Sequence, residues 1–88
     1  MLKISIREAP GEPVTMRLDG QVSARWVKLL RQTCDAHLKR GARVTLDLQN
    51  VSFADREGVA LLQTMANRGV EILNSLPFIA EQIREETR

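Results

Sequence analysis

The sequence has little cysteine, few aromatic residues and no long hydrophobic run, and each shortage excludes a class of protein. Cys34 is the single cysteine, so an internal disulfide and a cysteine-based zinc site are both excluded. The aromatic residues, Trp26, Phe53 and Phe78, are too few for a base-stacking platform. No apolar stretch approaches the length of a membrane span and no signal-peptide pattern is present, so we expect a cytoplasmic protein without direct membrane insertion.

The charged residues are numerous but nearly balanced. Lys and Arg number 13 and Asp and Glu number 11, a net charge of +2, and the signs are interspersed, so we expect no nucleic acid partner. With one His, one Cys and no glycine-rich phosphate loop, no nucleophile–base pair or metal set can be assembled. We therefore expect no catalytic residue, no metal and no cofactor, and we expect His37 to lie on a helix surface. The length of 88 residues predicts a single domain over residues 1–88.

Apolar periodicity predicts the secondary structure. Alternation predicts strands over residues 2–7, 14–18 (ending at Asp19-Gly20), 43–48 and 70–73, with a turn at 9–13 making an antiparallel hairpin of the first two. Helical spacing predicts one helix from the N-cap Ser23 to about residue 39 and a second to about residue 67. A last helix is expected near the end, where Leu76, Ile79 and Ile83 form an apolar stripe. This order predicts an α/β fold: a small, mixed four-stranded sheet with three helices mainly on one face.

The segment Val44–Leu62 contains a strand, a short connection and the start of a helix. Val51 and Phe53 are expected to be apolar anchors within the connection. Asp55 is expected to cap the second helix, since its carboxylate can accept hydrogen bonds from the free amides of the first turn. Gly58 is expected to allow close packing of that helix on the sheet, where a side chain would be crowded.

Several positions in this segment form a recognisable motif: Leu46-Asp47-Leu48, Val51, Phe53, Asp55, Gly58, Val59 and Leu62. Together with Leu18-Asp19-Gly20 and Asn74-Ser75-Leu76-Pro77, they resemble the pattern of STAS domains, the family of bacterial anti-sigma-factor antagonists. Members usually continue into a further strand and a terminal helix, so the resemblance implies a STAS-like fold truncated at the C-terminus. An uncovered sheet edge or helix face is then expected, which favours homodimerisation as one association.

The motif departs from the family pattern directly after Asp55. In the phospho-switched members this position is a Ser or Thr that a partner kinase modifies, whereas here it is Arg56, and the second hydroxyl position is Glu57. A guanidinium offers no hydroxyl nucleophile, so the phosphoacceptor-equivalent position cannot be phosphorylated. Arg56 is either a partner contact or a plain surface charge, and Glu57 is either a permanent anion or a solvated acid at the helix start.

The resemblance implies a non-enzymatic protein–protein interaction module without the usual phospho-switch. Its partner would be a kinase-type anti-sigma factor or a related regulatory protein. The expected partner-binding residues are those of the connection and the helix start: Asn50, Ser52, Asp55, Arg56, Glu57 and Gly58. Two alternatives stay open, which are an accessory subunit of an ABC-transporter ATPase and a STAS domain that senses a small ligand or nucleotide.

Overall fold

The computed structural model describes residues 1–75, 77 and 79–81. Its strands and helices follow the expected order: β1 (Leu2–Arg7), β2 (Val14–Val22), α1 (Ala24–Lys39), β3 (Val44–Ala54), α2 (Arg56–Asn67) and β4 (Glu71–Leu73). Residues 77 and 79–81 are helical, at the place of the expected last helix. Leu76 and Ile83 of its predicted apolar stripe lie outside the described residues.

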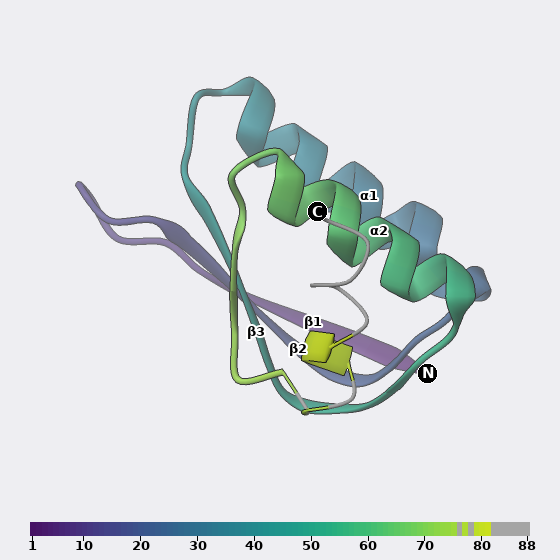
Figure 1. The fold of residues 1–88 in the computed structure, drawn as a ribbon. Coiled ribbons are helices and arrows are strands. Elements are labelled where there is room, and N and C mark those ends of the chain that lie inside the picture. Colours follow the sequence, from purple (N-terminus) through teal and green to yellow (C-terminus); the bar gives the residue numbers. More distant parts are fainter. Residues whose placement is uncertain (76, 78, 82–88) are drawn as a thin grey trace.

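The four strands form one mixed sheet in the order β1-β2-β3-β4. β1 pairs with β2 antiparallel, whereas β3 is parallel to β2 and β4 is parallel to β3. α1 and α2 lie side by side across one face of this sheet, and both begin at the same end of the molecule (Figure 1). The predicted α/β fold with a mixed four-stranded sheet is therefore confirmed.

The hydrophobic core lies between the sheet and the two helices. Each strand presents alternate apolar side chains to this face, and each helix presents residues spaced three and four apart. Burying one such side chain contributes about 1.5–3 kcal/mol, so this shared core is what fixes the helices on one face. The fully buried side chains include Met16, Leu18, Leu30, Cys34, Leu46, Leu48, Leu61, Leu62, Met65 and Ile79.

β2 and β3 are both longer than the alternation predicts. The predicted ends were Gly20 and Leu48, but the strands continue to Val22 and Ala54. The predicted short connection is thus wrong, because these residues still pair with β2. The pairing contains two register shifts, and such an irregularity interrupts the period of two while the strands stay hydrogen bonded.

The same irregularity explains an error about Phe53. Both Val51 and Phe53 were expected to be apolar anchors, but only Val51 is buried, at 1% exposure, whereas Phe53 is 47% exposed. Only Ser52 lies between them, but the register shift falls at this point of the strand, so the rule that residues two apart share a face does not apply. Phe53 therefore belongs to the surface.

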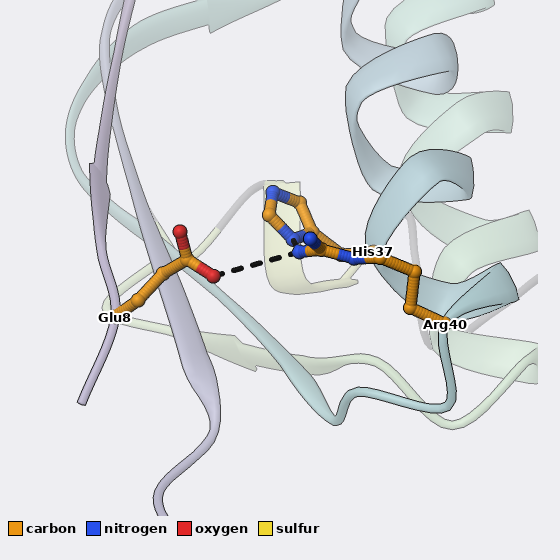
Figure 2. Close-up of polar contacts among 3 residues, drawn as sticks. All are labelled: Glu8, His37 and Arg40. Carbon is orange, nitrogen blue, oxygen red and sulfur yellow. Dashed lines mark hydrogen bonds and ion pairs between the residues drawn. The ribbon is translucent and has the colours of Figure 1, made fainter. Parts of the chain in front are cut away.

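His37 was expected on the helix surface but is buried, with 8% exposure. Its Nδ1 lies 2.7 Å from the Arg40 guanidinium, and Arg40 also forms an ion pair of 3.5 Å with Glu8, which follows β1 (Figure 2). The backbone carbonyl of His37 accepts hydrogen bonds from the amides of Arg40 and Ala42 at the end of α1. The chain that leaves β1 comes close to the last turn of α1, a contact that helix periodicity cannot anticipate.

Candidate functional site

Asp55 joins the two helices at their N-terminal ends. One carboxylate oxygen, Oδ1, accepts a hydrogen bond of 2.7 Å from the Gly58 amide in the first turn of α2. The other, Oδ2, accepts one of 2.8 Å from the amide of Ala24, the first residue of α1. The Asp55 amide itself donates to the carbonyl of Val22 at the end of β2. One residue therefore ties α1, α2 and β2 together.

The predicted N-cap role of Asp55 is confirmed, and the structure adds the second helix. Ser23, the predicted cap of α1, does occupy the N-cap position, but its side chain makes no capping hydrogen bond. The Asp55 carboxylate bonds the α1 amide instead. The hydrogen bonds from Gly58 and then Ala24 hold the pKa of Asp55 below its ordinary value, against an opposing effect of desolvation. Asp55 is therefore an anion at neutral pH.

Gly58 is buried where α2 crosses the end of β2. A Cβ atom added there would lie 2.0 Å from the carbonyl oxygen of Val22 and 2.9 Å from its carbonyl carbon. The predicted reason for glycine, close packing of helix on sheet, is confirmed. Gly58 consequently shapes the site from beneath and presents no side chain to a partner.

Between Asp55 and Gly58, the side chains of Arg56 and Glu57 are exposed in the first turn of α2. Neither side chain makes a hydrogen bond or an ion pair with any residue that the structure describes. The flanking Asp55 and Gly58 fix the backbone of this turn, so both charged side chains project from a rigid position. The helix macrodipole favours Glu57 here and disfavours Arg56.

The exposed end of β3 lies directly before this turn. Asn50 donates a hydrogen bond of 2.6 Å from Nδ2 to Asp19 Oδ1, and the Ser52 hydroxyl lies 3.4 Å from the Gly20 carbonyl, to which it donates. Both contacts join β3 to β2. We call the exposed side chains of β3's end and α2's start the corner surface, which consists of Asn50, Ser52, Phe53, Arg56 and Glu57.

Of the predicted site residues, the structure places four on the corner surface and gives Asp55 and Gly58 internal contacts. Phe53 is the member that the sequence reasoning missed, and its only signal was the break in alternation after Leu48. Over the described ranges, no cluster of three or more His, Cys, Asp or Glu could hold a metal ion. No helix in that same part of the chain is long and apolar enough to cross a membrane.

Comparison with known proteins finds one family and several solved structures of similar fold. The family model described as "Mlab, STAS domain" matches residues 6–79. No curated protein matches the chain.

Among solved structures, the anti-sigma factor antagonist SpoIIAA in its unphosphorylated form has a TM-score of 0.72 at 23% identity, over 90% of this chain and 79% of that one. The phosphorylated form of the Bacillus cell fate determinant SpoIIAA gives 0.73 at 23% identity, over 96% and 83%. An antisigma-factor antagonist STAS domain from Rhodobacter sphaeroides gives 0.65 at 20% identity, over 83% and 86%. At these identities the likeness concerns the fold.

Proposed function

The chain belongs to the STAS-domain family, and we propose that it acts as a non-enzymatic protein-interaction module in a regulatory circuit. Its docking site is the corner surface, held in place by Asp55 and Gly58. The structural likeness to SpoIIAA, an anti-sigma factor antagonist, supports a protein partner. We propose that this partner is a kinase-type anti-sigma factor and that the complex forms in the cytoplasm.

Arg56 is the observation that carries this proposal. A cation in the first turn of a helix is disfavoured by about 0.3–1 kcal/mol, and Arg56 has no ion pair within the described residues to offset that cost. Its place on the surface therefore has no explanation in the stability of the fold. Arginine is enriched among the residues that dominate protein interfaces, and its planar guanidinium can bind a carboxylate through two hydrogen bonds. An acidic group of the partner fits this position.

The module is proposed to work without a phospho-switch at Arg56. A phosphoserine at this position would carry about −1.5 to −2 charges, whereas Arg56 carries +1. The corner surface therefore differs by roughly three charge units from that of a phosphorylated relative. The hydroxyl of the corner surface belongs to Ser52, which donates to the Gly20 carbonyl of the neighbouring strand. Incubation with the anti-sigma kinases of the same genome and ATP should leave the corner unmodified. Stoichiometric phosphate on Ser52 would contradict this part of the proposal.

A pull-down from the native host tests the docking site. Arg56→Glu reverses the charge at an exposed position, so it should abolish capture of the partner without affecting the fold. Arg56→Ser should weaken capture and restore a hydroxyl for a kinase. Arg43→Glu is the matched control, because Arg43 is exposed directly before β3, away from the end that carries the corner surface. Equal capture by wild type and Arg56→Glu would refute the site.

An accessory role on an ABC-transporter ATPase is the second candidate. Arg56 favours it, because a contact that no kinase can modify suits a subunit that stays bound. The protein captured by the wild type decides between the two partners. A histidine-kinase-like protein supports the anti-sigma pathway, whereas a transporter ATPase supports the accessory subunit.

A further inference from the structure

Among the strands of the described residues, β1 lies at the edge of the sheet and pairs with β2 alone. The Gln21 amide donates to the Met1 carbonyl, and these two residues directly continue the register in which Leu2 faces Gly20. Hydrogen-bonded and non-hydrogen-bonded pairs alternate along an antiparallel ladder. The odd-numbered residues of β1 therefore bond to β2, and the N–H and C=O groups of Leu2, Ile4 and Ile6 point to the free edge.

The side chains of this edge have a pattern that suits pairing. On the face that the helices cover, Ile6 is 47% exposed and Ile4 is partly buried, so the core does not fully cover the edge. On the opposite face, Lys3, Ser5 and Arg7 are exposed. Unpaired backbone groups beside exposed apolar side chains form a template for another strand.

We propose that β1 pairs antiparallel with β1 of a second copy of the chain, about a two-fold axis at Ile4. The two sheets then join into one continuous sheet across an isologous interface. In this register Ile4 faces Ile4 of the second copy and Leu2 faces Ile6, so the exposed Ile6 becomes covered. Lys3 faces Ser5, and the backbone groups of residues 2, 4 and 6 are the ones that form the new ladder.

The charges of Lys3 and Arg7, on the face of the sheet opposite the helices, select this register. An axis at Ser5 would place Lys3 opposite Arg7 twice, and an axis at Lys3 would place two lysines opposite each other. Like charges in directly opposed positions destabilise a strand pair. A slip by one residue would set apolar side chains against polar ones. It would also place the free backbone groups of Leu2, Ile4 and Ile6 opposite residues whose own backbone groups already bond to β2. The axis at Ile4 avoids all three conflicts and pairs residues 2–6 of β1 with the same residues of the second copy.

The association is expected to be weak, because the pairing of two short strands buries less than the roughly 1,000 Å² of a stable interface. Sedimentation equilibrium from about 1 μM to about 1 mM covers the corresponding dissociation constants. Wild type should shift from monomer to dimer within this range. A wild type that stays monomeric throughout would overturn the proposal, which does not depend on the proposed function.

Charge changes at Ser5 test the register. Ser5→Glu places a carboxylate opposite Lys3 in both symmetric pairs and should tighten the dimer about two- to thirty-fold, and Ser5→Lys should weaken it by a similar factor. Ser5 is exposed, so neither change disturbs the core. The controls Gln49→Glu and Gln49→Lys make the same changes at an exposed position of β3 and should leave dimerisation within about two-fold of wild type. A dimer whose affinity does not respond in opposite directions to the two Ser5 variants would refute this interface.

Discussion

Replacing Gly58 by alanine should destabilise the protein, although alanine is the better residue for a helix. The added Cβ would lie 2.0 Å from the Val22 carbonyl oxygen, and real Cβ atoms essentially never approach another atom within 3.0 Å. α2 and β2 must therefore separate by about 1 Å, the difference between these two distances. The obstacle is backbone, so a change of side-chain rotamer cannot relieve it.

Two effects of opposite sign decide the size of the change. Glycine to alanine within a helix gains about 0.5–1 kcal/mol from backbone entropy. Overpacking costs about 1–3 kcal/mol, and the backbone obstacle places Gly58 towards the upper end of that range. The net loss should be roughly 1–2 kcal/mol, which lowers the melting temperature of a domain of this size by about 4–16 °C. The same Val22 carbonyl accepts the Asp55 amide, so the separation also disturbs the helix cap.

Urea unfolding followed by circular dichroism measures this change, with Ala60→Gly as the matched control. Ala60 is exposed on the same helix, so its replacement should cost only the helix-propensity difference of about 0.5–1 kcal/mol. If packing governs Gly58, both variants are less stable than wild type. A Gly58→Ala protein that is more stable than wild type would show that propensity dominates and that the close approach to Val22 is not a constraint.

Three further predictions concern the titratable groups and the caps. Asp55→Ala should lower the urea midpoint far more than Ser23→Ala, because Asp55 bonds the first turns of both helices and Ser23 makes no capping bond; equal effects would refute the shared cap. Hydrogen bonds from Gly58 and then Ala24 lower the folded-state pKa of Asp55, and those from Asn74 and then the Gln49 amide lower that of Asp47. Both carboxylates therefore stabilise the folded state fully above their unfolded pKa of about 4, and this stabilisation is lost as the pH falls through the folded pKa values. Urea titrations between pH 7 and pH 2 should therefore show stability falling below about pH 4, with a smaller fall for Asp47→Asn; an unchanged fall in that variant would contradict the prediction. Burial raises the pKa of the Cys34 thiol to about 11, so a disulfide reagent at pH 8 should react slowly with the native protein and rapidly in urea, and rapid reaction in the native state would show that Cys34 is accessible.

The sequence predicted the order of the elements and the Asp55 cap of α2, but it did not predict which individual side chains meet across the fold. The Asp55 cap of α2 is a hydrogen bond between residues three apart, so the sequence pattern at the start of the helix was enough to predict it. Its bond to Ala24 crosses 31 residues and depends on two helices beginning side by side. The ion pair of Arg40 with Glu8, beside the buried His37, likewise joins segments 32 residues apart and is not visible in the helix pattern.

The sheet gave a further kind of error, since alternation reports which side chains are buried and not where pairing ends. β3 continues for six residues after Leu48 because it keeps bonding to β2 across two register shifts. Within those residues the alternation is lost, so the sequence indicated a loop and placed Phe53 inside. A strand with a bulge and a short connection are therefore indistinguishable by period alone.

At the start of α2, the residues that hold the fold are different from those that are available to a partner. Asp55 and Gly58 are constrained by β2 and by the helices, whereas the side chains of Arg56 and Glu57 make no hydrogen bond or ion pair with the described residues. Substitutions at the first pair should reduce stability and partner binding together, because they move the backbone that presents the second pair. Substitutions at Arg56 should change binding with stability left within about 0.5 kcal/mol, as is usual for an exposed position. A large loss of stability in Arg56→Glu would mean that this arginine supports the fold and would remove the main reason to assign it to a partner.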